Sequence, residues 1–407
     1  MTKSLLKILG SSVLAQLLGL AIIPFLVKSY NPGQISLLAF FTTFIGISTI
    51  LLTLKSENQL FQIDLDGDAA SYTVFICFYA LSVFILCAPI VYFFGDKVTD
   101  IGRMMLAVFM LGGLSLSVHN VLLNLLLRFK NTTGYAVSKA VRSVCEFILY
   151  LLCIAFILNE KVLVYSGILA YFIAFSYSVR ECRVLLGVCG LKKHIAKGRK
   201  LFVRLNKNIQ FDFLSSLFNV MSINMPIIYF GMAGDVELAG LYFMVTRLLG
   251  APMLLLGQSI SAALKGHAFS EKKEKHSVNG SIEYTVKLLL LYFLPGYILI
   301  IPAVNYGFPV FFGSEWIGIT SMALILLPYF IARFMFNCLS GMVYVIGEFK
   351  SNLIFQGVLL LISLISLWLP FFDGFKIQSY SIGLAICYFF YAFYMVRRCK
   401  MMDESQS

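Results

Sequence analysis

Apolar stretches of about 20 residues return twelve times along the chain, with short polar connections between most of them. An α-helix rises about 1.5 Å per residue, so about 20 residues cross the roughly 30 Å hydrocarbon core of a bilayer. Lipid offers backbone polar groups no hydrogen bonds, so only helices or closed barrels span it. These stretches do not alternate as barrel strands would. The pattern predicts an all-α polytopic membrane protein with twelve transmembrane helices.

The predicted spans form two halves of six, separated by the longest polar segment. We expect an N-terminal lobe at residues 1–180, a basic cytoplasmic linker at 181–207 and a C-terminal lobe at 208–407. Internal duplication is common in transporters, whose substrate sites lie where the repeats meet. The pattern favours two six-helix lobes around a central cavity. The expected spans are 8–27, 35–54, 72–94, 104–127, 136–158, 162–179, 213–230, 238–264, 288–304, 319–339, 353–369 and 380–396.

The placement of basic residues predicts the orientation. The chain has 407 residues, of which 13% are charged, and its net charge is +12. With the N-terminus taken as cytoplasmic, 25 of the 32 Lys and Arg residues lie in inside segments, five in outside loops and two within spans. This asymmetry is typical of membrane proteins with cytoplasmic basic loops. We therefore expect both termini in the cytoplasm and no nucleic-acid partner.

The linker has a mixed basic and apolar pattern. Residues 180–207 contain nine basic residues and one acid, with apolar residues at Leu191, Ile195, Phe202 and Leu205. One interpretation is a helix on the inner membrane surface, with its basic face toward anionic headgroups. The other is a topology signal without a binding role. The residues alone do not decide between the two interpretations.

Charged residues at membrane depth are the first candidates for a substrate site, because each costs roughly 2.5–3.5 kcal/mol on insertion scales. Lys139, Arg142 and Glu146 fall on one stripe of the fifth span, at spacings of three and four residues. One interpretation is a cationic lining for an anionic substrate, with Glu146 balancing charge or carrying a proton. The other is an ion pair between Arg142 and Glu146 near the inner surface.

The second half carries three further candidates. Arg247 and Gln258 lie eleven residues apart on one face of the eighth span, and Arg333 lies within the tenth. Such residues face a cavity or a neighbouring helix rather than lipid, unless they snorkel to an interface. His119 in the fourth span favours helix–helix hydrogen bonding instead.

The chain shows no pattern of a cofactor, metal or nucleotide site. Its nine cysteines form no CxxC pair, its four histidines lack ligand spacing, and no GxxxxGK[ST] loop occurs. We expect no catalytic residues, no metal and no cofactor. Transport by this chain would be driven by a gradient, by the substrate or by a partner protein.

Several motifs resemble one family in their order along the chain. Residues 10–34, GSSVLAQLLGLAIIPFLVKSYNPGQ, look like the opening of bacterial Wzx-type oligosaccharide flippases, whose superfamily includes the MATE exporters and the lipid II flippase MurJ. Residues 55–59 resemble the charged turn after the second helix of these proteins. Residues 219–226 and 239–258 resemble their seventh and eighth helices, and residues 312–316 their fifth outer loop. The first outer turn departs from the family, which commonly has an acid and Phe-Gly after Asn-Pro.

The resemblance implies that a sugar repeat unit on undecaprenyl diphosphate moves from the inner to the outer leaflet of a bacterial inner membrane, as in O-antigen or other polysaccharide assembly. Its implied partners are the undecaprenyl-diphosphate-linked oligosaccharide, membrane lipids and polysaccharide assembly proteins. Arg142, Arg247 and Arg333 suit the diphosphate oxygens, because guanidinium groups make bidentate contacts.

Two other functions fit the same span count. A MATE-like antiporter of cationic compounds would need acidic residues in its cavity, whereas the membrane residues here are mostly arginines. A polytopic sugar polymerase or glycosyltransferase would need a sizeable outer loop or paired carboxylates. The longest outer loop, residues 305–316, is short. A non-transporting scaffold conflicts with polar residues on so many spans.

Overall fold

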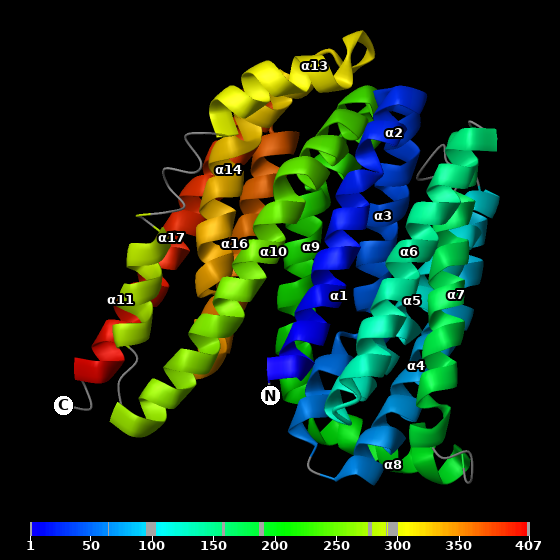
Figure 1. The fold of residues 1–407 in the computed structure, drawn as a ribbon, viewed down its shortest axis with the longest axis vertical. Coiled ribbons are helices and arrows are strands. Elements are labelled where there is room, and N and C mark those ends of the chain that lie inside the picture. The colour runs from blue at the N-terminus through cyan, green and yellow to red at the C-terminus, as the bar shows by residue number, and fades with distance from the viewer. Residues whose placement is uncertain are drawn as a thin grey trace. The chain divides into compact units, whose positions relative to one another are not determined.

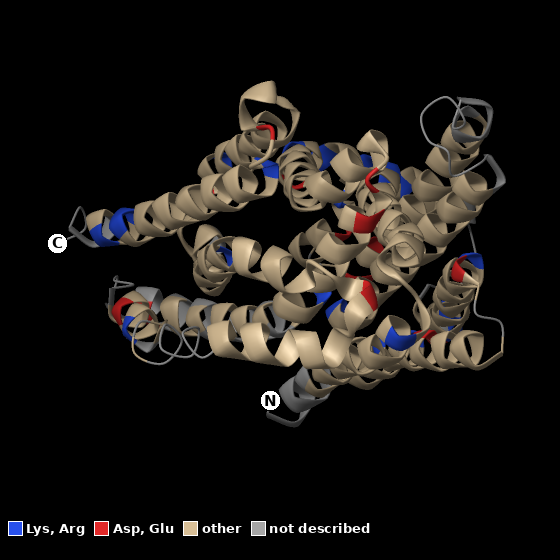
Figure 2. Cartoon of the chain, turned by 90° about the horizontal axis from the view of Figure 1, so that it is seen from above, with Lys and Arg blue, Asp and Glu red and all other residues tan. Residues whose placement is uncertain are grey.

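Almost all described residues of the chain are helical (Figure 1). The computed structural model describes residues 2–63, 65–94, 103–156, 159–186, 191–275, 279–289, 291 and 300–404. Within these ranges, nine helices are long and apolar enough to cross a membrane. Lys, Arg, Asp and Glu residues occupy few positions along the helices (Figure 2). The predicted all-α polytopic fold is thus confirmed.

The longer helices follow the predicted spans closely, and short helical turns connect several of them. The elements are α1 (Thr2–Ala21), α2 (Ile23–Ser29), α3 (Pro32–Thr53), η1 (Ser56–Gln62), α4 (Asp66–Phe94), α5 (Arg103–Arg128), α6 (Thr132–Phe156), α7 (Glu160–Leu186), α8 (Leu191–Arg204), α9 (Asn206–Ala233), α10 (Val236–Lys275), α11 (Asn279–Leu288), η4 (Ala303–Gly307), α13 (Phe308–Phe312), η5 (Ser314–Trp316), α14 (Ile319–Leu339), α15 (Met342–Ile346), α16 (Phe349–Trp368), η6 (Pro370–Phe372) and α17 (Lys376–Glu404).

Three spans differ from expectation. The first predicted span is divided into α1 and α2, because Pro24 stands in the first turn of α2, where its missing N–H is tolerated. The eighth is part of α10, a helix of 40 residues that continues to Lys275. Most of the ninth, 288–304, lies outside the described residues.

The chain divides into two compact units. Unit 1 comprises Met1–Met221 and Phe230–Glu237, and unit 2 comprises Ser222–Tyr229 and Leu238–Ser407. Helix α9 therefore contributes residues to both units, and α8 belongs to unit 1. The predicted boundaries at residues 180 and 208 do not coincide with this division, and the central cavity stays a prediction.

The basic linker forms α8, which packs on α4 within unit 1. Leu201 and Phe202 of α8, with Leu205 directly after it, cover a buried apolar cluster from η1, the following Ile63, α4 and α5. At Gly198 the two helices approach so closely that a Cβ atom would lie 2.5 Å from the Ser71 carbonyl oxygen. The apolar face of α8 is therefore covered by protein.

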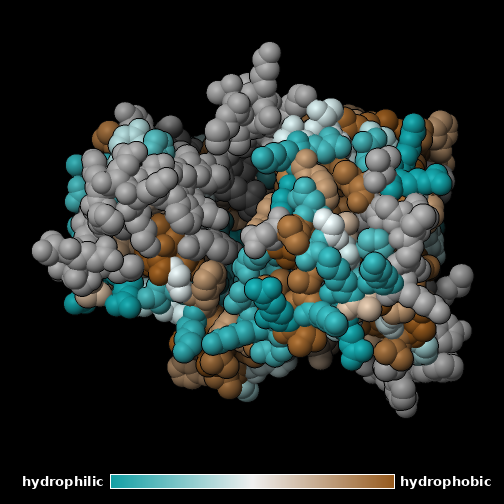
Figure 3. Space-filling view, turned by 90° about the horizontal axis from the view of Figure 1, so that it is seen from below, coloured by the Kyte–Doolittle hydropathy of each residue, from teal (hydrophilic) through white to brown (hydrophobic). Residues whose placement is uncertain are grey.

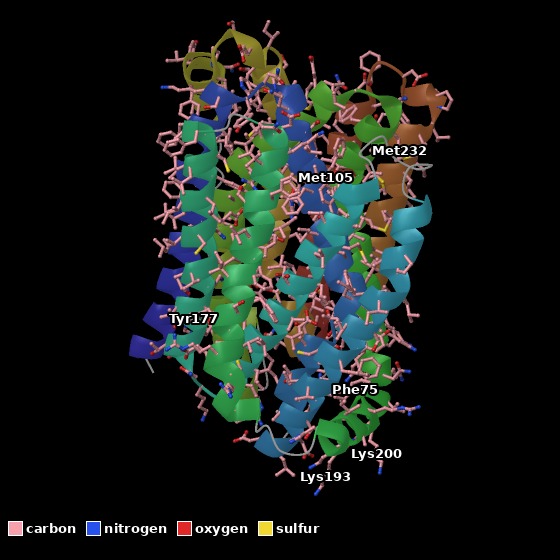
Figure 4. The ribbon with its side chains drawn as sticks, turned by 90° about the vertical axis from the view of Figure 1, so that its right-hand side faces the viewer. Phe75, Met105, Tyr177, Lys193, Lys200 and Met232 are labelled. Carbon is pink, nitrogen blue, oxygen red and sulfur yellow. The ribbon has the colours of Figure 1, made fainter. Side chains whose placement is uncertain are left out.

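Polar contacts fix the register of α8 on α4. His194 Nδ1 lies 2.9 Å from the Ser71 hydroxyl, and Lys197 forms an ion pair with Asp68. Lys193 and Lys200 point away from the helices at the lower end of the molecule (Figure 4). Hydrophilic side chains gather on this end of unit 1 (Figure 3). Binding of anionic headgroups by α8 stays a prediction.

Candidate functional site

The candidate residues of unit 1 lie on α6, which packs against α1, α5 and α7. Lys139 donates from Nζ to the Ser12 hydroxyl of α1 at 2.7 Å, and its ammonium lies 5.8 Å from the centre of the Tyr135 ring. Both partners are neutral. The positive charge of Lys139 is thus held in place without a carboxylate in contact among the described side chains.

Arg142 lies one turn further along α6. Its guanidinium carbon is 5.8 Å from the centre of the Tyr171 ring on α7, and its Nε is buried without a hydrogen-bond partner in the described structure. A guanidinium over an aromatic face gains electrostatic attraction without being neutralised. The Arg142 site therefore keeps its positive charge and one unused donor.

His119 belongs to the same part of unit 1. It is fully buried on α5, and its Nδ1 lies 2.8 Å from the Ser178 hydroxyl on α7. This contact agrees with the predicted helix–helix hydrogen bond. Its Nε2 is buried with no partner among the described residues, and the ring interacts electrostatically with Arg142. Sequence reasoning did not connect His119 with Arg142, because they lie on different helices.

Glu146 is half-buried on α6. Among the described side chains, no ion pair joins it to Arg142 or to Lys139 within 4.0 Å, although the spacing permits one. The interpretation of Arg142 and Glu146 as a simple i,i+4 ion pair is not supported by this geometry. A role for Glu146 in charge balance or proton transfer stays a prediction.

Arg333 of unit 2 lies in a group of buried tyrosines. Its Nη1 donates to the Tyr329 hydroxyl at 2.8 Å, one turn earlier on α14. The Tyr329 ring packs against Tyr380 and Tyr388 of α17, with ring centres 5.8 and 6.1 Å apart. These tyrosines are at most 1% exposed, whereas Arg333 is half-buried. The rings therefore support the guanidinium from one side.

Hydroxyl groups connect this tyrosine group to α9. Tyr242 of α10 donates to the Ile223 carbonyl at 2.7 Å, and Tyr380 donates to the Ser222 carbonyl at 3.1 Å. The helix bond to the Ser222 carbonyl would come from the backbone nitrogen of residue 226, which is Pro226 and has no hydrogen. Tyr380 therefore supplies the donor that Pro226 lacks.

Arg247 is half-buried on α10, with its guanidinium carbon 4.7 Å from the centre of the Phe243 ring. Gln258 lies on the same helix, but its side chain is outside the described residues. Close packing of α10 on α14 is shown at Gly257, where a Cβ would lie 3.0 Å from the Asn337 Cβ. A shared polar face of Arg247 and Gln258 stays a prediction.

One arrangement recurs at all three candidate arginines. Arg142, Arg247 and Arg333 each lie over an aromatic ring, at 5.8, 4.7 and 5.7 Å from its centre. None of them has a carboxylate within 4.0 Å among the described side chains. An arginine held by a ring retains its charge and its donors, so each can bind an anionic oxygen.

Among the described side chains there is no group of three or more His, Cys, Asp or Glu residues that could hold a metal ion.

The tyrosines that pack around Arg333 were not identified from the sequence. A signal was present, because Tyr329 precedes Arg333 by four residues and Tyr380 precedes Tyr388 by eight, so each pair shares a helix face. The partner helix of each face could not be read from that spacing.

Comparison with known proteins identifies the fold. No protein-family model matches the chain, and neither does any curated protein sequence. Among solved structures, an inward-facing multidrug resistance MATE family transporter of the MOP superfamily is 13% identical, with a TM-score of 0.69 over 98% of this chain and 95% of that one.

Two further solved structures have the same fold. A MOP superfamily transporter from Pyrococcus furiosus, for which a reverse polarity of the binding pocket suggests a different function, is 14% identical. Its TM-score is 0.69 over 99% of this chain and 96% of that one. A eukaryotic MATE transporter is 13% identical, with a TM-score of 0.63 over 99% and 98%. At these identities the similarity shows the fold, which is that of MATE transporters.

Proposed function

We propose that this chain is a flippase that moves an undecaprenyl-diphosphate-linked oligosaccharide from the cytoplasmic to the periplasmic leaflet of a bacterial inner membrane. The observation that carries the proposal is the state of the three arginines, which rest on aromatic rings and have no carboxylate partner among the described side chains. Uncompensated charge at membrane depth is costly and marks a substrate path.

The chemistry of the proposed substrate matches these groups. Its diphosphate needs guanidinium and ammonium donors, which Lys139 and Arg142 offer in unit 1 and Arg247 and Arg333 offer in unit 2. Its sugar hydroxyls need hydrogen-bonding partners, and its lipid tail can remain in the bilayer. The MATE-type fold supports transport by alternating access, with both termini in the cytoplasm as the charge bias predicts. Assembly proteins for the polysaccharide would supply and consume the substrate.

A MATE-like exporter of cations is the second candidate. The fold similarity to a multidrug resistance transporter favours it. The charge of the candidate residues argues against it, since those of unit 1 (Lys139 and Arg142) and those of unit 2 (Arg247 and Arg333) are positive, and positive side chains repel a cationic compound. The Pyrococcus furiosus transporter, with its reverse polarity of the binding pocket, supports the view that this fold accepts more than one kind of pocket. A sugar polymerase or glycosyltransferase has no support from the fold.

The test is genetic and biochemical. We expect deletion to leave lipid-linked repeat units in the cytoplasmic leaflet and to abolish the surface polymer, and the wild-type gene to restore both. Arg142→Ala, Arg247→Ala and Arg333→Ala should each lower periplasmic exposure of the repeat unit by about tenfold or more, with normal membrane amounts.

The exposed Arg397 of α17 offers a matched control, and Arg397→Ala should leave exposure of the repeat unit unchanged. Normal surface polymer in the deletion strain, together with loss of cationic dye export, would establish the exporter instead. Equal activity in all four arginine variants would remove the arginines from the proposed site.

A further inference from the structure

Helix α8 carries a row of cations along one side. Four exposed basic residues follow one another at spacings of four, three and four residues: Lys193, Lys197, Lys200 and Arg204. Residues at these spacings lie on the same side of a helix. We call these four residues the basic row. Arg199, on another side of α8, is exposed as well.

Most of the charge of the basic row is not compensated by acidic side chains. Lys197 pairs with Asp68 of α4, and no other residue of the row has a carboxylate within 4.0 Å among the described side chains. Residues 182–211 contain no Asp or Glu at all. Hydrophilic side chains gather at this end of unit 1 (Figure 3), and Lys193 and Lys200 point away from the helices there (Figure 4). This end of unit 1 therefore presents a cationic surface.

The apolar face of α8 is not available to lipid. Phe202 packs against three aromatic rings of α4, whose centres lie 6.5, 5.4 and 5.6 Å from its own: Tyr72, Phe75 and Tyr79. An amphipathic helix that inserts into a membrane buries its apolar face between the lipids. Because α4 covers this face, α8 can meet lipid headgroups through its charges but not by inserting its apolar face into the bilayer.

The position of α8 along α4 is that of a headgroup layer. The candidate span of α4 begins at Asp66. Helix α8 contacts α4 at Asp68, which pairs with Lys197, and at Ser71, which lies against Gly198. These contacts are two and five residues into the span, which corresponds to about 3–8 Å of helix. The headgroup layer on each side of the hydrocarbon core is about 5–8 Å thick. The basic row thus lies at the level of the headgroups.

We propose that the basic row binds the anionic phospholipid headgroups of the adjacent leaflet, and that this contact is electrostatic. The bias of basic residues places this end of the chain in the cytoplasm, and the cytoplasmic leaflet carries anionic lipids. Each Lys or Arg near such a surface strengthens binding by about fivefold. The lipid would hold one side of α8 while α4 holds another. This inference is independent of the transported substrate.

The test uses the full chain purified in an uncharged detergent. Phosphatidylglycerol or phosphatidylcholine with the same acyl chains is added, and native mass spectrometry measures the affinity of each lipid for the protein. We expect phosphatidylglycerol to bind more tightly and to raise the Tm more than phosphatidylcholine does. The difference in Tm should shrink as NaCl is added, because salt screens exposed charges.

Matched variants locate the contact. Lys193→Gln combined with Lys200→Gln should lower the affinity for phosphatidylglycerol by about tenfold or more. Lys28→Gln combined with Lys161→Gln removes two exposed lysines of unit 1 from the predicted outer loops and should bind this lipid like the wild type. Val203→Ser changes an apolar side chain of α8 that is 65% exposed, and it should leave an electrostatic contact unaltered.

Three results would overturn the proposal. The first is an equal affinity of the wild type for the two lipids. The second is unchanged binding of phosphatidylglycerol in the Lys193 and Lys200 variant, which would mean that the lipid binds elsewhere. The third is an equal loss in Val203→Ser, which would assign the contact to insertion. Arg204→Gln is a further variant of the basic row, and it keeps the test decisive if the double variant does not fold.

Discussion

The Tyr380 hydroxyl donates to the Ser222 carbonyl at 3.1 Å, across 158 residues of sequence. Pro226 removes the helix donor of that carbonyl, so a tyrosine from α17 completes the hydrogen bonding of α9 within unit 2. The Ser363 hydroxyl lies 3.4 Å from the same oxygen and provides a weaker second contact. The carbonyl that Pro226 leaves without a helix donor is therefore contacted by side chains of two other helices.

Tyr380→Phe should destabilise the protein by about 1 kcal/mol, because it leaves the Ser222 carbonyl with the longer bond alone. Thermal or denaturant unfolding of the purified protein measures this change. Tyr391→Phe is the matched control on the same helix, since its buried hydroxyl has no hydrogen-bond partner in the described structure. An equal loss of stability in both variants would contradict the role given to the Tyr380 hydroxyl.

Arg333→Lys should lower translocation by about tenfold while preserving the charge, because an ammonium lacks the planar donors that bind Tyr329 and a diphosphate together. Periplasmic exposure of the lipid-linked repeat unit is the measurement, normalised to the amount of protein in the membrane. Arg397→Lys makes the same exchange at an exposed position of α17 and should have no effect. Full activity of Arg333→Lys would show that charge alone suffices.

Gly198→Ala should destabilise unit 1 by about 1–3 kcal/mol, because the new Cβ would meet the Ser71 carbonyl oxygen at 2.5 Å and α8 would shift on α4. The expected result is a lower Tm of the purified chain. The exposed Ala196 on the same helix is the control position, and Ala196→Ser should change the Tm little. An unaltered Tm in Gly198→Ala would mean that α8 is not seated on α4 as described.

Acid should weaken the link between α17 and the residue preceding α16. The Ser351 hydroxyl and Arg398 hold the pKa of Glu348 below its usual value of 4.5. A depressed carboxyl pKa contributes stability above the unfolded-state pKa, and this contribution is lost as pH falls through the folded value. The Arg398 nitrogen Nε lies 2.8 Å from Glu348 Oε1, and the Arg398 side chain is 44% exposed.

Glu348→Gln should therefore reduce stability at neutral pH by a fraction of about 1 kcal/mol and have no effect well below about pH 4. Unfolding curves of wild type and variant across this range measure the difference. A difference that persists unchanged at the acid end would assign the effect of the substitution to packing rather than to charge.

Much of the fold could be predicted from the sequence. The apolar stretches predicted the helices because a chain in lipid must satisfy its own backbone hydrogen bonds. The division of the first span into α1 and α2 was missed, although Pro24 is visible in the sequence. The amphipathic pattern of residues 191–205 predicted a helix, but not that α4 would cover its apolar face.

The sequence predicted which residues form the candidate site, but it did not predict which side chains they contact. Arg142, Arg247 and Arg333 stand out because charge is rare at membrane depth. Their aromatic partners did not stand out, since the chain contains 38 Phe and 21 Tyr residues and most helices are apolar on every side. On such helices the hydrophobic periodicity does not show which face packs against protein, so the aromatic partner of each arginine could not be predicted from the sequence.

The sequence by itself determined the helical class, the approximate spans and the bias of basic residues toward one side, because backbone hydrogen bonding and insertion energy act locally along the chain. Only the tertiary structure decided that α8 packs on α4 and that the Arg142 guanidinium lies over the Tyr171 ring. It also decided that the Tyr380 hydroxyl donates to the Ser222 carbonyl, which has no helix donor because of Pro226. These contacts join residues on different helices, and packing selects them from many apolar faces of nearly equal hydrophobicity.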